Sequence, residues 1–410
     1  MEQTHGDATI AFLSDGYRFG LNRFERLGTD AFRTRLGGLP MTFLRGANAA
    51  GMFYGGDRFT RQGAMPPSVV HLLQDRNSVQ ALDGARHMHR KAMFVKLLTD
   101  EGELARLSDI FTRHWEQAKS QWHERGNGAD RKIVLHDAAV AILARTAIEW
   151  AGIPLEQTDV NQRTQELAGM VEYAGSFGPR NWIAQLRRRR TEAWARDLVH
   201  AARAAGPDAS PLAELAHWDE TDGAVLSDEI LAVELLNLLR PIVAVARFIV
   251  FSALALYRYP QWQETFRSGD YTDLEHFVHE VRRLTPFFPV IAGRAREDFS
   301  WQGHQFTAKD RVVLDLFATN HDPVLWTAPY KFVPERFRDW NGDPNTLIPQ
   351  GAGEVSNGHR CPGEKATIEL MKAAVRCLTQ MEWSVPKQNL RVNYSRFPAL
   401  PQSGFVMEVA

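Results

Sequence analysis

The chain has 410 residues, and its 48 Lys and Arg residues almost balance its 49 Asp and Glu residues, so the net charge is −1. A hydrophobic fraction of 44%, with 23 Phe and 11 Trp, can fill a large core and excludes a disordered or collagen-like chain. Because no basic excess is present, the charge gives no reason to expect a nucleic acid as partner. A small or neutral ligand fits this composition better.

The N-terminal residues indicate a cytoplasmic protein, because they lack the basic segment, apolar run and cleavage site of a secretory signal. The most apolar stretch, residues 241–256, is only 16 residues long and contains Arg247. It therefore predicts a buried helix, and no integral membrane segment is expected. The two cysteines, Cys361 and Cys377, would lie about 24 Å apart along a helix, too far for a disulfide.

The pattern of apolar residues predicts a mainly helical (α+β) chain that forms one domain over residues 1–410, with no repeat or linker. Residues 43–59 alternate short apolar runs with glycine-rich turns, which is typical of small strands. A basic run at residues 187–190 is expected to be a solvated helix face. Further strands are predicted at residues 311–317, 390–392 and 405–409. Helical periodicity covers residues 86–123, 134–151, 158–175, 180–205, 227–258, 272–284 and 363–382.

A glycine-rich loop, residues 350–364, delivers Cys361 to the start of a predicted helix. Free amides at a helix N-terminus favour a thiolate, which is a good metal ligand or nucleophile. The glycines allow the backbone to turn tightly and to approach a flat ligand. A structural zinc site would need more ligands than the nearby His359. A nucleophile would need a base that the sequence does not place, and a purely structural role suits Cys377 better.

This loop resembles the haem-binding loop of the cytochrome P450 family, in which one cysteine thiolate is the axial ligand of the haem iron. Glu280-Val-Arg-Arg283 resembles the Glu-x-x-Arg helix of that family, and Pro-Glu-Arg336-Phe resembles its later arginine-containing loop. Residues 320–329 resemble the segment that leads into this loop. The resemblance implies the P450 haem-thiolate fold with a small peripheral β subdomain, haem b bound through Cys361, and an ion-paired triad of Glu280, Arg283 and Arg336.

The predicted long helix at residues 227–258 departs from the common pattern. It lacks the acid and threonine that deliver protons to iron-bound dioxygen in oxygen-using members, and it contains Arg240-Pro241. Proline loosens the helix and redirects its neighbours. A guanidinium binds a carboxylate through two parallel hydrogen bonds, so Arg240 is expected to hold a ligand; the alternative is a buried ion pair with Glu234 or another acid. Glu354 also stands where an aromatic residue is usual, seven positions before the cysteine, and the loop is longer.

The Arg240-Pro241 pair resembles the fatty-acid peroxygenase branch of the family. This resemblance implies hydroxylation of long-chain fatty acids at the α and/or β carbon by hydrogen peroxide, with no flavin, no NAD(P)H and no electron-transfer partner. Arg240 would bind the substrate carboxylate, which would act as general base and then acid during O–O cleavage. Tethering the carboxylate brings only the α and β carbons close. A monomer or weak oligomer is expected.

The same resemblance implies roles for further residues. His87 and Lys91, four residues apart on one helix face, would bind the haem propionates. Tyr54 and Arg61 match other propionate positions, although a core tyrosine and an exposed arginine would look the same. Gln80 matches a distal position that is Gln in hydroxylating and His in decarboxylating members. The acyl channel is expected to be lined by Phe287, Phe288 and Val290, which would look the same in a plain core. Gln74 stands where relatives usually place an apolar channel residue, a departure that bears on chain length and on the balance of α and β products.

Three alternatives stay open. Decarboxylation to a terminal alkene could occur as a side activity. An oxygen-dependent monooxygenase of the same fold would turn over with NAD(P)H and a reductase but not with peroxide alone. A non-catalytic haem- or lipid-binding protein would bind without forming a product. Arg247, seven residues after Arg240 and on nearly the same helix face, is given no role.

Overall fold

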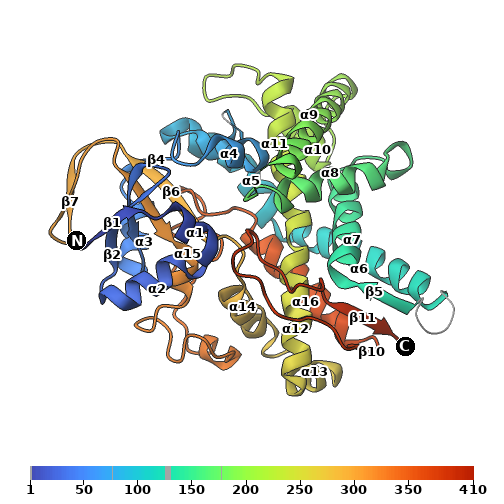
Figure 1. Ribbon diagram of the computed structural model, residues 1–410. Helices are drawn as coiled ribbons and strands as arrows, with labels where there is room; N and C mark the ends of the chain where they lie inside the picture. The colour runs from blue at the N-terminus through green and yellow to red at the C-terminus, as the bar shows by residue number, and fades with distance from the viewer. Residues whose placement is uncertain (1, 76, 125–130, 177) are drawn as a thin grey trace.

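A pair of apolar helices runs through the middle of the molecule in the computed structural model, which describes residues 2–75, 77–124, 131–176 and 178–410 (Figure 1). Helix α11 (Asp228–Ala244) begins at the cap Ser227 and contains Pro241, and α12 (Ala246–Arg258) follows after Val245. The stretch Asp228–Arg258 is long and apolar enough to cross a membrane, but 94% of its most apolar window is buried inside the protein. Its apolar character is therefore that of a core helix, as predicted for residues 241–256.

Other long helices surround this pair. Helices α7, α8 and α9 pack against α11, whereas α14 and α16 pack against α12. The predicted helix at residues 86–123 is in fact two helices, because Asp100 is extended and its carboxylate accepts a hydrogen bond from the Glu103 amide, which starts α6. The bounds of the long helices are α5 Gly84–Thr99, α6 Glu101–Glu124, α7 Leu135–Trp150, α8 Val160–Glu172, α9 Pro179–Ala205, α14 Leu274–Leu284 and α16 Glu364–Thr379.

Shorter helices complete the α part. They include 3-10 turns, one of which carries Gln80. Their bounds are α1 Thr9–Asp15, α2 Arg18–Leu27, α3 Ala47–Tyr54, α4 Pro67–Leu73, η1 Val79–Ala81, η3 Leu155–Gln157, α10 Pro211–Ala216, α13 Pro260–Arg267, α15 Leu316–Asn320 and η4 Pro334–Phe337.

The main sheet lies at the left of Figure 1, beside α1, α2, α3 and α15. Pairs β1–β2 and β3–β9 are parallel, and the other neighbours are antiparallel. The strands, in spatial order, are β1 Glu2–Asp7, β2 Ala31–Leu36, β3 Leu39–Leu44, β9 Arg311–Asp315, β6 Val290–Ala295 and β4 Phe59–Thr60. Two smaller sheets contain β10 Trp383–Ser384, β11 Val406–Val409 and β5 Lys132–Val134, and β7 Phe299–Trp301 with β8 His304–Phe306.

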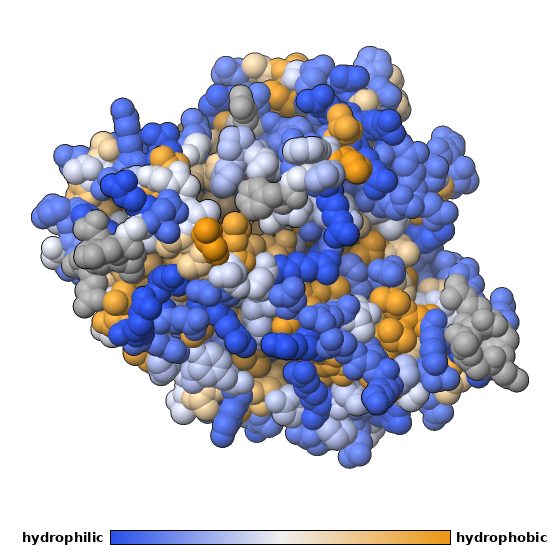
Figure 2. Space-filling view, viewed as in Figure 1, coloured by the Kyte–Doolittle hydropathy of each residue, from blue (hydrophilic) through white to orange (hydrophobic). Residues whose placement is uncertain are grey.

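Three strand predictions need correction. Residues 43–59 contain helix α3 between strands β3 and β4, so strands alone were the wrong prediction. Strand β9 ends at Asp315, because this carboxylate accepts from the Ala318 amide and starts α15. Near residues 390–392 the structure has only an isolated bridge between Val392 and Pro401. Figure 2 shows a mainly hydrophilic face, with apolar residues in small separate groups.

Candidate active site

A cavity of about 250 Å³ lies between α5, α11, α16 and the cysteine loop. Arg61 is the one predicted cofactor or substrate residue that does not line it; its guanidinium lies over the rings of Phe53 and Tyr54, at 4.3 and 5.0 Å from their centroids. The chain thus brings together predicted residues from five separate segments. Those that line the cavity are Tyr54, Gln74, Gln80, His87, Lys91, Arg240, Pro241, Phe287, Phe288, Val290 and Cys361.

Cys361 stands three residues before α16, and its amide donates to the Gln350 carbonyl at 3.1 Å. Burial raises the pKa of the Cys361 thiol, whereas the Gly363 amide and the Lys91 ammonium act in the opposite direction. The amide at the helix start thus acts in the expected direction, but burial outweighs it. Burial in an apolar cavity disfavours the charged thiolate more strongly than the nearby amides favour it.

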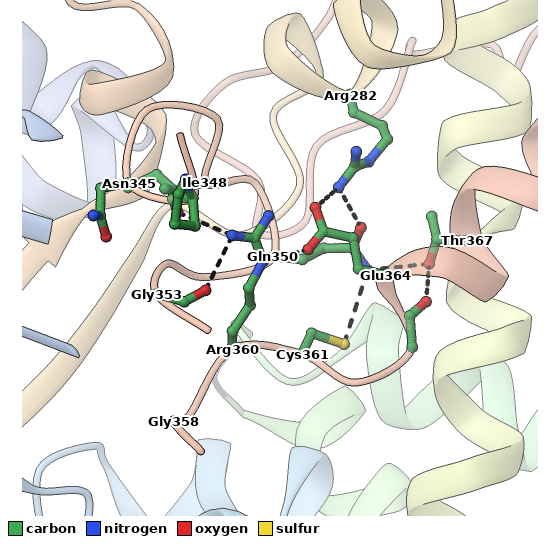
Figure 3. A network of polar contacts seen from close by, with 12 residues as sticks. Arg282, Asn345, Ile348, Gln350, Gly353, Gly358, Arg360, Cys361, Glu364 and Thr367 are labelled. Atoms are coloured by element: carbon green, nitrogen blue, oxygen red, sulfur yellow. Dashed lines mark hydrogen bonds and ion pairs between the residues drawn. The ribbon is translucent and has the colours of Figure 1, made fainter. Parts of the chain in front are cut away.

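A polar network fixes the cysteine loop to α14 and α16 (Figure 3). Arg282 donates to the Glu364 carboxylate and, at 3.1 Å, to Oε1 of Gln350. Nε2 of Gln350 donates to the Thr367 hydroxyl at 3.0 Å and lies 3.9 Å from the Cys361 sulfur. Because Arg282 can only donate, Oε1 must face it and the amide group must face the sulfur.

Arg282, Gln350 and Glu364 were not predicted as site residues, although all three belong to the two motifs at residues 280–283 and 350–364. Glu354, seven positions before the cysteine, is exposed, and Gln350 is the residue beside the sulfur. The longer loop explains the difference. The chain leaves the sulfur after Gln350, passes through the exposed Glu354, and comes back so that the Cys361 amide bonds to the Gln350 carbonyl. The one available signal was the adjacent pair Arg282-Arg283, of which only Arg283 had a predicted partner.

Glu280, Arg283 and Arg336 lie together at the end of α14. The Glu280 carboxylate accepts two bonds from Arg283, at 2.7 and 2.8 Å, and one from Arg336 at 3.3 Å. Arg283 also donates to the carbonyls of Asn320 and Pro329, both at 2.8 Å. Because Glu280 and Arg283 are fully buried, this pairing holds the segment at residues 320–329 against α14.

His87 and Lys91 project from α5 towards the cysteine loop. Lys91 donates to the carbonyls of Gly358 and Arg360, the latter at 2.7 Å. His87 contacts the Gly358 carbonyl at 3.2 Å through Nε2, and burial lowers the pKa of His87. Burial likewise lowers the pKa of Lys91 to about 8. Among the residues that the structure describes, no carboxylate forms an ion pair with Lys91.

Arg240 is 5% exposed and points from α11 into the cavity. It donates to the Leu72 carbonyl at 3.3 Å and to Oδ1 of Asn237 at 3.1 Å. Burial lowers the pKa of Arg240 to about 9, and Arg188 contributes in the same direction. Arg188 also donates to the Leu72 carbonyl, at 2.7 Å, and is fully buried. A solvated face at residues 187–190 was therefore wrong for this member of the run.

Glu234 is fully buried one turn before Asn237, but it does not pair with Arg240. Its carboxylate accepts from the Val79 amide at 2.7 Å and from Asn237 Nδ2 at 2.9 Å, with Arg90 at 3.5 Å. Within the described ranges, Arg240 has no carboxylate partner. The alternative interpretation of Arg240 as half of an ion pair is thus wrong for this structure.

Aromatic residues form the apolar side of the cavity. The Phe287 ring lies 4.6 Å from that of Phe248 and 4.9 Å from that of Phe288, which is 40% exposed. The apolar lining therefore continues to the protein surface. Arg247 lies outside this cavity, pairs with Glu172 and lines a second cavity.

The Cytochrome P450 family model matches residues 271–407. The structure of Cytochrome P450SP alpha (CYP152B1) in complex with (R)-ibuprofen has a TM-score of 0.94 and 39% identity over 98% of both chains. The chain belongs to the cytochrome P450 family. Cytochrome P450EX alpha (CYP152N1) with myristic acid also has a TM-score of 0.94, at 36% identity, covering 100% of this chain and 98% of that chain.

These matches confirm the predicted fatty-acid peroxygenase branch of the P450 family and its mainly helical haem-thiolate fold. OleT, solved as a variant with arachidonic acid, is 30% identical with a TM-score of 0.94 and covers 100% of this chain and 97% of that chain. The curated relatives match a shorter segment. Cytochrome P450 71D18 of Mentha gracilis is 34% identical over 121 residues, 28% of this P450 chain, and the match spans only 23% of that relative.

Proposed function

We propose that this P450 uses hydrogen peroxide to hydroxylate long-chain fatty acids at the α and/or β carbon. Arg240 carries the proposal, because it is a buried cation in the Cys361 cavity without a carboxylate partner in the described part of the chain. A fatty acid would supply this carboxylate and an apolar tail for Phe287 and Phe288. Similar proteins have been solved with myristic and arachidonic acid.

The cavity residues fit a haem b group. Cys361 offers its sulfur, and the propionates could be bound by Lys91 and His87 in the cavity lining and by Arg61 beside it. A Cβ at residue 351, which has a φ of +99°, would lie 2.7 Å from the Tyr54 hydroxyl, so the loop can close against this tyrosine only with glycine. When bound, the haem would supply an iron whose thiolate ligand favours cleavage of the peroxide O–O bond.

The substrate carboxylate provides an acid–base group beside Arg240, where the described residues that line the cavity include no Asp or Glu. Arg240 binds this carboxylate through two hydrogen bonds and stays protonated at neutral pH, since burial lowers its pKa only to about 9. The carboxylate accepts a proton from the peroxide and returns it to the departing oxygen. One oxygen atom becomes the new hydroxyl group and the other leaves as water. Tethering at Arg240 holds the α and β carbons closest to the reacting oxygen.

Gln80 lines the same cavity, and in this proposal it favours hydroxylation over decarboxylation to an alkene. Peroxide replaces dioxygen and reducing equivalents, so the proposal includes no flavin, NAD(P)H or electron-transfer partner. The deciding experiment incubates the haem-loaded protein with myristic acid and peroxide and identifies products by mass spectrometry. We expect α- or β-hydroxymyristate with peroxide alone. Product that forms only with NAD(P)H and a reductase would instead support an oxygen-dependent monooxygenase.

A second measurement tests the role of the carboxylate. A short carboxylic acid that is too small to reach the reacting position should allow peroxide-dependent oxidation of a neutral molecule such as ethylbenzene. The short acid would occupy Arg240 and act as the proton acceptor. Equal oxidation rates with and without the short acid would contradict the proposed mechanism.

A further inference from the structure

We infer that Asn237 is a positioning residue that aims Arg240 and fixes Gln80 as a hydrogen-bond donor towards the ligand. Asn237 is 4% exposed and contacts both groups: its Oδ1 accepts from Arg240 at 3.1 Å, and its Nδ2 donates to Oε1 of Gln80 at 3.3 Å. It also donates to Glu234 at 2.9 Å. The inference rests on the proposed function, because it concerns how the same cavity recognises a carboxylate.

The chemistry of the partners determines the direction of each bond. Arg240 has only donors, so the Asn237 side chain must present its oxygen to Arg240. Its amide group then faces Glu234 and Gln80, and Gln80 can meet a donor only with Oε1. The Gln80 Nε2 group is consequently turned away from Asn237. In the described ranges this group has no partner within the protein, and Gln80 lines the cavity.

Glu234 fixes the main chain beside Gln80 as well. Its second oxygen accepts from the Val79 amide at 2.7 Å, and Val79 is the first residue of the η1 turn that carries Gln80. The carbonyl of the same residue contacts Nδ1 of His87 at 2.8 Å. Gln80 is therefore held at its backbone through Glu234 and at its side chain through Asn237. Both supports lie on one face of α11, at positions i and i+3, and Arg240 follows at i+6.

Two groups that can only donate thus face one ligand. The Arg240 guanidinium and the Gln80 Nε2 group would both meet the oxygen atoms of an ionised carboxylate, which only accepts. An amide turned the other way would place its carbonyl against the same oxygens and repel them. Asn237 therefore selects an ionised head group and determines which substrate carbon lies near the reacting oxygen.

Two substitutions test the inference in opposite ways. In Asn237→Leu the side-chain bonds to Arg240, Gln80 and Glu234 are all lost. We expect the dissociation constant for myristate, measured by spectral titration of the haem-loaded protein, to rise about tenfold. In Asn237→Asp the new carboxyl group pairs with Arg240 and shares one proton with the neighbouring Glu234 carboxyl group, so Gln80 no longer meets a fixed amide donor. We expect a rise of about a hundredfold or more, together with a changed ratio of α to β product. Binding of neutral imidazole should stay within twofold.

Asn181→Leu is the matched control, since Asn181 is 3% exposed and, among the residues that the structure describes, its side chain bonds to the Tyr173 carbonyl and to Gln185. It should leave myristate affinity and the α to β ratio unchanged. Gln80→Met keeps α11 intact and removes the donor, so it should reproduce the altered ratio and the weaker binding even if the Asn237 variants fail to fold. Unchanged affinity and ratio in Gln80→Met or in both folded Asn237 variants would overturn the inference. Absence of hydroxylation in the unsubstituted protein would instead overturn the proposed function.

Discussion

Replacing Arg240 by Met should stabilise the folded protein while it abolishes fatty-acid binding. Burial lowers the pKa of this arginine from 12.5 to about 9. At about 1.4 kcal/mol per pKa unit, keeping the guanidinium charged in the folded protein costs about 5 kcal/mol at neutral pH. Because the pKa in the folded protein is the lower one, this cost is fully present below about pH 9 and fades above that pH.

Two hydrogen bonds offset part of this cost. Arg240 bonds to the Leu72 carbonyl and to Asn237, and each bond contributes roughly 1.5 kcal/mol. The Leu72 carbonyl keeps its bond from Arg188 in the variant, so only Asn237 loses a partner. We expect a net gain of roughly 2 kcal/mol in the free energy of unfolding. The variant also lacks the two charged hydrogen bonds to the fatty-acid carboxylate. The binding free energy should therefore weaken by about 3 kcal/mol or more, which is a hundredfold or greater rise in the dissociation constant.

The assay compares urea unfolding of the haem-loaded proteins at pH 7, with and without myristate. Myristate should stabilise the unsubstituted protein but not the Arg240→Met variant. Arg188→Met is the matched control, because Arg188 is equally buried but pairs with Glu192 at 2.7 Å. Its loss should destabilise the fold. A loss of stability in Arg240→Met as large as that in the control would contradict the expected cost of the buried charge. Myristate binding within threefold of that of the unsubstituted protein would contradict the role of Arg240 as the carboxylate site.

Three further substitutions test other parts of the site and the fold. Cys361→Ser should remove the thiolate-type spectrum of the reduced carbon monoxide complex; an unchanged band would show another ligand. Burial raises the pKa of Asp315 to about 7. Between about pH 4 and 7 the folded protein therefore keeps a proton on Asp315 that the unfolded chain releases, so the free energy of unfolding falls as the pH rises through this range. Asp315→Asn should flatten this slope in urea unfolding at pH 5 and 7.5, and a slope as steep as before would point to other groups. Glu280→Gln leaves Arg283 and Arg336 without their carboxylate, so the free energy of unfolding should fall by about 3 kcal/mol and the purified protein should contain less haem. Equal haem content in both proteins would contradict this expectation.

The sequence was informative where the chemistry is local. The glycines around Cys361 and the proline after Arg240 are neighbours in the chain, so their combined meaning could be read without a structure. Helix positions followed from apolar periodicity for the same reason. Boundaries were less predictable, because the break at Asp100 depends on one side chain that caps the next helix.

Contacts between distant segments could not be predicted in this way. Gln350 reaches Arg282 across 68 positions, and Asn237 reaches Gln80 across 157. Amides carry a donor and an acceptor, so neither spacing nor composition says which end serves which partner. The direction of each amide follows only when a residue that can only donate is seen beside it, as Arg282 is beside Gln350 and Arg240 beside Asn237.

Arg188 and Arg240 lie side by side in the fold, and the difference between their partners is the strongest reason to assign a ligand to Arg240. Arg188 and Arg240 are both buried, and both donate to the carbonyl of Leu72. Arg188 has Glu192 as its counter-ion, whereas Arg240 faces the cavity and, in the described part of the chain, bonds only to an amide oxygen and a carbonyl. A buried cation without a counter-ion costs stability, and a chain under selection for stability alone would replace it. The same cost becomes useful if an anion arrives from outside, because binding then restores the missing charge at the place where the reaction needs a proton acceptor.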